Sequence, residues 1–267
     1  MAGTSQTTPR ARGSGFSQQN PPDQPPALGE AAMRQARNSA AFWAATGRSR
    51  GHEVIHRRGF LAVLGGERAG TRILLQEPDP DASELAELTQ LLDRSTGPVV
   101  AEDPFSSTDL GHLGMRNWQM PIMLRRPGPV SAPAAEVIRV QRAPELQAAE
   151  RIVISGFELT GFVPYRPGEM FPTTLIEQPG VDVYLAVLNG EAVAACVTVT
   201  DDGFGSHYWV GTPPEHRSRG AGRAVMLGAL APMANLPVTL TASRLGRPLY
   251  ESLGYTAVTM STWWSSR

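Results

Sequence analysis

Apolar side chains recur along this chain of 267 residues with two spacings, one typical of helices and one typical of strands. Apolar positions three or four residues apart predict helices over residues 28–46, 83–92, 144–158, 221–231 and 248–253. Short apolar runs and alternating apolar and polar positions predict strands over residues 53–64, 71–76, 99–100, 120–124, 136–141, 181–188, 192–200, 206–212, 238–241 and 256–264. Helices and strands that follow one another in this way predict an α/β protein.

Two segments of biased composition divide the chain. Residues 1–27 are mostly Gln, Pro, Ser, Thr and Gly, so they bury too little apolar surface to offset chain entropy and are predicted to be a disordered tail. Residues 126–135, with the sequence RPGPVSAPAA, are predicted to be a linker. The expected organisation is therefore a first domain over residues 28–125 and a second domain over residues 136–267.

The two expected domains share short stretches of sequence. Residues 61–67 read LAVLGGE, and residues 185–191 read LAVLNGE. Residues 113–115 read LGM and residues 253–255 read LGY, and a predicted apolar strand follows each of them. Each match alone is short enough to be coincidence, but two matches in the same order favour an internal duplication.

The composition removes several kinds of chemistry. All 24 residues counted as Lys or Arg are arginines, so there is no lysine for a Walker-type phosphate loop, a Schiff base or a protein-kinase ATP site. A phosphate site would have to use arginine, backbone N–H groups or a metal. Cys196 is the only cysteine, which excludes an intrachain disulfide and a zinc site of the Cys-x-x-Cys type.

Charge and hydropathy give no sign of a nucleic-acid or membrane partner. The formal net charge is -1, which provides no basic footprint for nucleic acid. The longest apolar run, residues 224–231, is far shorter than the roughly 18 residues of a membrane span, and the N-terminus lacks the apolar core of a secretory signal. We therefore expect a cytoplasmic protein, and the usage rich in Arg, Ala, Gly and Pro suggests a bacterial genome rich in G and C.

Residues 208–224 have the composition of a phosphate-binding loop between a strand and a helix. Gly220 and Gly222 let a ligand approach the backbone closely, and the start of the helix presents unpaired N–H groups and the positive end of its dipole. Three guanidinium groups accompany them, those of Arg217, Arg219 and Arg223. The segment therefore predicts a pyrophosphate site built without lysine; the pattern G-x-G-x-x-G of a Rossmann turn is not present in it.

The spacing Arg217-x-x-Gly220-x-Gly222 resembles the acyl-donor motif of the GNAT superfamily of acyl-CoA-dependent N-acetyltransferases. Residues 242–255, ASRLGRPLYESLGY, resemble the late segment of the same family, a small helix followed by a Leu-Gly-Phe/Tyr turn. The resemblance covers residues 136–267. It implies a mixed, mostly antiparallel central sheet with flanking helices and a cleft where strands four and five splay apart. Together with the repeats, it implies that this fold is duplicated in tandem.

The resemblance also implies that acetyl-CoA is the acyl donor and that no metal takes part. Backbone groups at the end of the fourth strand would pair with the pantetheine arm, and N–H groups of the loop and helix start would hold the pyrophosphate. The positions are Val210, Gly211 and Thr212 for the pantetheine arm, and Arg217, Ser218, Arg219, Gly220, Ala221, Gly222 and Arg223 for the pyrophosphate. Ser243 stands where many relatives carry an Asn that contacts the donor, which leaves that contact open.

The implied reaction is direct transfer of an acyl group from acyl-CoA to a primary amine. Tyr250 matches the family tyrosine that lies near the thioester sulfur and protonates the departing thiolate; a core tyrosine is the alternative. His207, near the start of the fourth strand, is the candidate base, unless the amine arrives already deprotonated. Cys196 lies in a strand among Ala and Val and is expected to be a buried, inert thiol.

The acceptor is expected to be a small-molecule or peptide amine, and its identity stays open. An apolar cluster precedes the strand at residues 181–188 and comprises Phe157, Phe162, Tyr165, Met170 and Phe171. This cluster could shape an acceptor pocket or pack in the core. Glu158 or Glu169 could attract a cationic amine or lie in solvent. The sequence is compatible with a monomer or a homodimer.

The first domain is predicted to be a degenerate copy. Where the phosphate loop should follow the strand at residues 71–76, residues 77–81 read EPDPD, which is acidic and free of glycine and would repel a pyrophosphate. Its expected role is structural, as a partner that walls the acceptor site.

Two other functions remain open. His52, Glu53 and His56 fit the H-E-x-x-H pattern of a zinc-dependent hydrolase, in which a helix brings both histidines to one ion. The flanking glycines and two β-branched residues favour a strand instead, where these histidines lie about 13 Å apart and cannot share an ion. The other alternative is a non-catalytic acyl-CoA-binding module, which would bind the donor without turnover.

Overall fold

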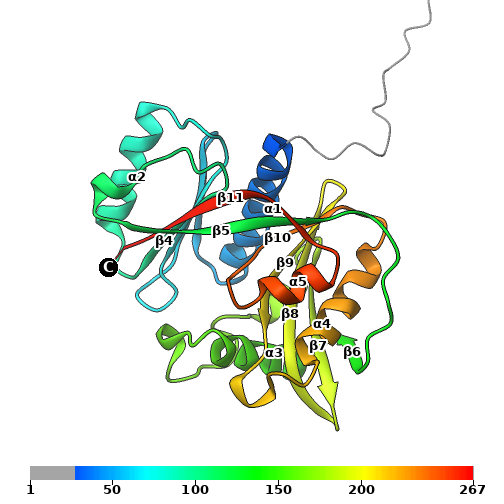
Figure 1. Cartoon of the computed structure of the whole chain (residues 1–267). Helices are drawn as coiled ribbons and strands as arrows, with labels where there is room; N and C mark the ends of the chain where they lie inside the picture. The colour runs from blue at the N-terminus through cyan, green and yellow to red at the C-terminus, as the bar shows by residue number, and fades with distance from the viewer. Residues whose placement is uncertain (1–27, 267) are drawn as a thin grey trace, which may run out of the picture.

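The computed structural model describes residues 28–266, and the tail predicted over residues 1–27 lies outside the described residues (Figure 1). The N-terminal half consists of α1 (Leu28–Ser49), β1 (Glu53–His56), β2 (Phe60–Leu64), β3 (Thr71–Leu75), α2 (Ala82–Arg94), β4 (Val99–Asp103) and β5 (Arg116–Arg125). The C-terminal half consists of β6 (Glu136–Arg139), α3 (Ala143–Gly156), β7 (Val181–Leu188), β8 (Glu191–Asp201), β9 (Phe204–Gly211), α4 (Ala221–Leu230), β10 (Val238–Thr241), α5 (Arg247–Ser252) and β11 (Thr256–Ser265). Short 3-10 helices lie in the connections, at η1 (Gly111–Leu113), η2 (Thr160–Phe162), η3 (Thr173–Leu175), η4 (Pro214–His216) and η5 (Ala231–Met233).

The predicted helices and strands are present, with ends that differ by a few residues, except in the segment predicted as one strand over residues 53–64. That segment forms two strands, because the chain turns where the Arg57 N–H donates to the Phe60 carbonyl at 2.8 Å. Gly59 in this turn donates its N–H to the carboxylate of Glu84 at 2.7 Å. A Cβ at Gly59 would lie 2.4 Å from that carboxylate, so a larger residue would block the contact that holds α2 against the turn.

The strands form one sheet in the order β1-β2-β3-β4-β11-β5-β10-β9-β8-β7-β6. The two halves exchange strands within it: β5 pairs with β10 of the C-terminal half, and β11, the last strand, pairs with β4 of the N-terminal half. β5 and β11 also pair with each other. Figure 1 shows them side by side across the middle of the molecule, with β11 ending beside β4. The halves therefore share one continuous sheet.

The sheet is mixed and mostly antiparallel, as expected, and its two parallel pairs differ in length. β3 and β4 pair at four successive positions, from Thr71 to Leu74. β9 and β10 pair only at Gly205 and Ser206, so residues 207–211 of β9 continue without a β10 partner. The sheet therefore splits open between β9 and β10, which confirms the splayed cleft, and it stays closed at the equivalent place in the N-terminal half.

The repeated stretches occupy equivalent places in the two halves. Residues 61–64 lie in β2, which pairs with β3, and residues 185–188 lie in β7, which pairs with β8; both pairs are antiparallel. Gly114 and Gly254 precede β5 and β11 with φ angles of 76° and 86°. The left-handed conformation explains why both Leu-Gly turns carry glycine.

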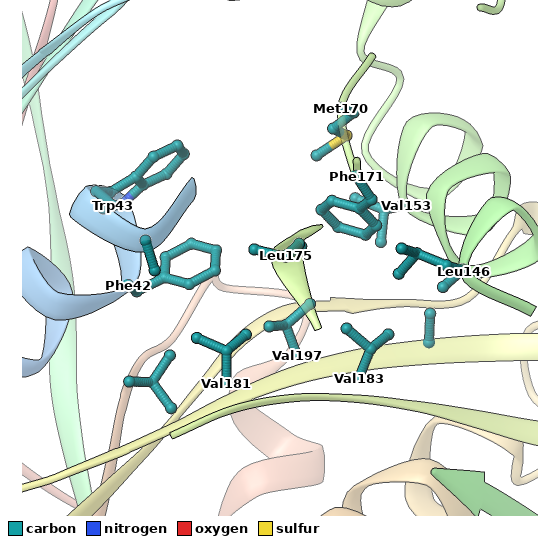
Figure 2. Packing of buried hydrophobic residues seen from close by; sticks show 14 of the residues in the cluster. Phe42, Trp43, Leu146, Val153, Met170, Phe171, Leu175, Val181, Val183 and Val197 are labelled. Carbon is teal, nitrogen blue, oxygen red and sulfur yellow. The ribbon is translucent and has the colours of Figure 1, made fainter. Parts of the chain in front are cut away.

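Buried apolar side chains lie on both faces of the sheet. On one face, α1 and α3 cover a cluster that includes Phe42, Trp43, Phe171 and Val197 (Figure 2). On the other face, α4 and α5 pack against the C-terminal strands and α2 packs against the N-terminal ones. Because α1 contacts strands of both halves, it joins them across the first face.

Candidate functional site

The end of β9 forms one wall of the split in the sheet. Trp209 has a left-handed φ of 51°, where pairing with β8 is irregular, so β9 carries a bulge at this point. Tyr208 stacks on Phe42 with ring centroids 4.2 Å apart, and Trp209 packs edge-on against Trp43 at 6.0 Å. Both rings therefore turn toward α1, and the backbone edge of residues 207–211 that faces away from β8 has no strand partner.

The start of α4 lies at the same end of β9. Gly220 is the N-cap with a φ of 81°, and no side chain caps the helix. A Cβ at Gly222 would lie 3.3 Å from the Thr212 hydroxyl oxygen, so the absence of a side chain keeps the helix start close to the strand end. Uncapped N–H groups at a helix start favour an anion, since they carry the positive end of the dipole.

The three predicted guanidinium groups play different structural parts. Arg217 donates from Nε to the Thr212 carbonyl at 3.0 Å and from Nη2 to the Gly156 carbonyl at 3.1 Å, which braces the loop. Arg223 donates to the Ser252 hydroxyl at 2.8 Å. Arg219 is exposed. Within residues 28–266 none of the three is paired with a carboxylate, so their positive charges remain for an anion.

The tertiary structure brings Tyr250 and His207 into one cluster on the α4 and α5 face. The Tyr250 ring lies 6.2 Å from the Tyr255 ring, which lies 6.2 Å from the His207 ring. Burial raises the pKa of Tyr250, so its hydroxyl stays protonated and can donate a proton or hydrogen bond at neutral pH.

His207 is buried and uncharged at neutral pH. Burial, with a smaller contribution from Arg125, lowers its pKa to about 3. Its Nδ1 lies 3.3 Å from the Sγ of Cys196, a buried thiol whose pKa burial raises. An imidazole with such a low pKa holds a proton weakly, so His207 has little capacity to store the proton of an ammonium group.

Several buried polar atoms on β9, at the end of β10 and beside them have no hydrogen-bond partner among the described residues. They are Nε2 of His207, Nε1 of Trp209, Oγ1 of Thr241 and the hydroxyl of Tyr255. Buried polar groups are normally satisfied, so unsatisfied ones on both faces of the split, Trp209 on the α1 face and His207 and Tyr255 on the other, indicate room for a ligand or water there. Ser243 is used locally, because its Oγ accepts the Gly246 N–H at 3.1 Å before α5.

The equivalent helix start in the N-terminal half is closed by the protein itself. Asp81 is the N-cap of α2, and its carboxylate accepts the N–H groups of Ser83 and Glu84 at 2.9 and 3.0 Å. The Glu84 carboxylate accepts the Asp81 N–H at 3.2 Å in return. This capping box occupies the N–H groups that α4 leaves open, and it adds negative charge.

The segment between α3 and β7 is fastened to the protein. Glu150 is fully buried and accepts four hydrogen bonds at 2.7–3.0 Å, from the Tyr165 hydroxyl and the N–H groups of Gly168, Met170 and Phe171. Glu169, one of the two acids that could meet a cationic amine, pairs with Arg68 of the N-terminal half at 2.6 Å. Phe162, Met170 and Phe171 belong to the buried core.

The H-E-x-x-H segment forms β1, with Glu53 to His56 in extended conformation. The helical geometry that would bring His52 and His56 to one ion is therefore not formed. In the described part of the chain, no group of three or more His, Cys, Asp or Glu residues is arranged to hold a metal ion. No helix among residues 28–266 is long and apolar enough to cross a membrane.

A cavity between the two halves was not anticipated from the sequence. Its lining includes Trp43, Arg50, Arg72 and Trp209. One sequence signal pointed to it: Arg72 interrupts the apolar strand at residues 71–76, where a charge needs a partner or a ligand.

The fold and the split sheet define the class: the chain has the fold of the GNAT N-acetyltransferases. A scan against protein families matched none, and a search of curated proteins found no match. Several solved structures are similar to this chain over most of its length. A GCN5-related N-acetyltransferase from Kribbella flavida is 20% identical with a TM-score of 0.59, covering 88% of this chain and 95% of its own. One from Sphaerobacter thermophilus is 16% identical with a TM-score of 0.51, covering 90% and 93%. A tandem GNAT protein from the clavulanic acid biosynthesis pathway is 13% identical with a TM-score of 0.50, covering 78% of each chain.

Proposed function

We propose that the protein is an acyl-CoA-dependent N-acetyltransferase that transfers an acyl group directly to a primary amine. The observation that carries this proposal is the split between β9 and β10 beside the uncapped start of α4. The N-terminal half lacks both features, because β3 and β4 stay paired and Asp81 caps α2. The C-terminal half is thus the catalytic domain of the proposal, the N-terminal half its degenerate partner, and residues 126–135 the connection.

In this proposal the acyl donor, acetyl-CoA, binds along the split between β9 and β10. The open backbone edge at Val210, Gly211 and Thr212 would pair with the pantetheine arm. The pyrophosphate would lie on the N–H groups from Ser218 to Arg223, where Gly220 and Gly222 leave the backbone accessible and Arg219 supplies an unpaired charge. The unsatisfied polar atoms around the split support this fit. When bound, the thioester supplies the activated acyl group.

The chemistry of the proposal assigns unequal roles to the two candidate residues. Tyr250 is assigned to the leaving thiolate: burial raises its pKa, so its hydroxyl stays protonated at neutral pH and can donate to the developing thiolate, while the same rise makes it a weaker acid for full proton transfer. His207 has a pKa lowered to about 3, which makes it a weak base at neutral pH. The small neutral fraction of the amine is therefore the species expected to react, and His207 is expected to act through its unpaired Nε2 as a hydrogen-bond acceptor or donor.

The variant Gly222→Glu tests the donor site. A carboxylate at this position would repel the pyrophosphate and fill the narrow space beside Thr212, so we expect acetyl-CoA to raise the melting temperature of the wild type and to leave that of the variant unchanged. Gly66→Glu is the matched control, because a Cβ at Gly66 meets open space in the turn between β2 and β3 of the N-terminal half.

Thiol release from acetyl-CoA across a panel of amines then tests turnover. Acetyl-CoA affinity that survives Gly222→Glu would contradict the donor site. Donor binding without thiol release from any amine would favour a non-catalytic acyl-CoA-binding module instead.

A further inference from the structure

The cavity between the two halves has a volume of about 290 Å³ and takes its walls from both of them. The N-terminal half contributes Trp43, Arg50 and Arg72, and the C-terminal half contributes Phe162 and Trp209. Figure 2 shows Trp43 on α1 and Met170, another lining residue, on the segment across from it. The volume is near the lower end of the usual range for ligand pockets, so it suits a small molecule.

The cavity borders the split in the sheet at Trp209. This residue is at once a wall of the cavity and part of the β9 segment that has separated from β10. A ligand in the cavity therefore lies on the α1 face of the split, whereas Tyr250 lies in the cluster on the α4 face. The ligand in the cavity and Tyr250 would therefore lie on opposite faces of the sheet, on either side of the split.

The lining carries the guanidinium groups of Arg50, Arg68 and Arg72 and the carboxylate of Glu158. Arg68 is paired with Glu169 at 2.6 Å, but Arg50 and Arg72 are in no ion pair among the described residues. Burial lowers the pKa of each of these two arginines to about 10, so both stay charged at neutral pH. Nearby carboxylates oppose this lowering: Glu150 and Glu169 raise the pKa of Arg50, on which Arg72 acts in the other direction, and Glu102 raises the pKa of Arg72. Neither arginine forms a direct ion pair with these carboxylates, so both guanidinium groups remain available to an anion in the cavity.

The Arg72 guanidinium is held by aromatic rings and keeps a hydrogen-bond donor free. Its guanidinium lies 4.0 Å from the ring centroid of Trp43 and 5.2 Å from that of Trp263. Its Nη1 is sealed from solvent and has no hydrogen-bond partner within the described part of the chain. The Nε of Arg50 donates a hydrogen bond to the Met170 carbonyl at 2.9 Å, which fixes the orientation of its guanidinium group. Rigid guanidinium forks of this kind match the planar geometry of a carboxylate.

We propose that this cavity binds the acceptor and selects small amines that carry a carboxylate, held by Arg72 and Arg50, with the apolar part of the molecule against Trp43, Trp209 and Phe162. This inference rests on the proposed acetyltransferase function, because only an acetyltransferase makes the bound amine an acyl acceptor. It gives the N-terminal half a direct part in specificity, because both anion-binding arginines belong to that half.

Direct binding tests the cavity without any acetyl transfer. L-phenylalanine and N-acetyl-L-phenylalanine are expected to raise the melting temperature of the wild-type protein, and L-phenylalaninamide, which lacks the carboxylate, to leave it unchanged. In Arg72→Gln the affinity for both carboxylates is expected to fall at least about tenfold. Arg116→Gln, at an exposed arginine on β5, is the control and should bind like the wild type. Equal stabilisation by the amide, or by phosphoethanolamine in place of the carboxylates, would overturn the assignment.

Kinetics separate this inference from the proposed function. If thiol release occurs, Arg72→Gln is expected to raise KM for L-phenylalanine at least about tenfold and to leave KM for acetyl-CoA unchanged. Arg50→Gln serves as the second variant if Arg72→Gln does not fold, with the same expected result. Thiol release that is equally fast with L-phenylalaninamide refutes the carboxylate selection while the acetyltransferase stands; carboxylate binding without any thiol release refutes the acetyltransferase while the anion site stands.

Discussion

At the scale of single residues, the buried carboxylate of Glu102 has a strongly shifted pKa. It lies on β4 and accepts the Ser39 hydroxyl of α1 at 3.1 and 3.2 Å. Burial raises its pKa to about 7, although Arg72 and the hydrogen bond from Ser39 act in the opposite direction. Since an unfolded glutamate titrates near 4.5, the folded protein binds an extra proton between these two values. Glu102 therefore lowers stability as pH rises from about 5 to above 7.

Glu102→Gln is expected to remove this dependence. The amide oxygen can still accept from Ser39, and it cannot ionise, so the melting temperature of the variant relative to wild type should increase steadily from pH 5 to pH 8. Thermal unfolding at several pH values measures the difference, and the titration of other groups, such as His207, cancels between the two proteins. Glu67→Gln, at an exposed position, should show no such trend. A difference that stays constant with pH would refute the buried, protonated carboxylate.

At the scale of elements, two helices with equivalent positions begin in opposite ways. α2 starts with a capping box in which Asp81 and Glu84 satisfy each other's backbone N–H groups. α4 starts with Gly220 in the left-handed conformation and no side-chain cap. The first arrangement stabilises the helix internally, and the second leaves the same groups for a ligand. This contrast is the reason why the donor site is proposed for the C-terminal half and not for the N-terminal half.

Asp81→Ala is expected to destabilise the protein without creating a donor site. Loss of the cap should lower the melting temperature by about 2–4 °C. Asp79→Ala, at an exposed residue two positions earlier, is the control and should have almost no effect. Equal melting temperatures for the two variants would mean that the cap contributes nothing. The variant should gain no acetyl-CoA affinity, because β3 and β4 remain paired beside the helix.

At the scale of the whole molecule, the exchange of β5 and β11 ties the two halves together. β5 fills the edge of β10, and β11 fills the edge of β4, so each half uses a strand of the other to complete its part of the sheet. Separating them would expose several strand edges and the apolar face under α1. The two sequence domains are thus expected to be stable only as a pair.

A protease site inserted between Ser131 and Ala132 tests this dependence. Both residues are exposed and lie outside regular structure, so cleavage there should not disturb the fold. After cleavage we expect the fragments to elute together in size-exclusion chromatography and to separate only in denaturant. Two separate peaks in native buffer would show that strand exchange does not hold the halves together.

The sequence by itself determined the local structure and is the basis for the proposed donor loop. Periodicity found nearly every helix and strand because each one has an apolar face of its own. Periodicity did not predict the turn at Gly59, because a glycine is needed there for a contact with the carboxylate of Glu84, 25 residues away. The glycines and arginines of residues 217–223 signalled a phosphate site because that chemistry needs a bare backbone and positive charge in a contiguous stretch.

Only the tertiary structure decided how the halves combine. Strand order depends on which edges meet in space, and neither β5 nor β11 carries a signal that names its partner. The same holds for the cavity: Trp43, Arg72 and Trp209 are far apart in the sequence, and only the packing of the two halves brings them to one cavity. A local sequence pattern shows which side chains of a segment will be buried. A site between the two halves depends on which residues become neighbours when the buried faces pack together, and a local pattern does not contain that information.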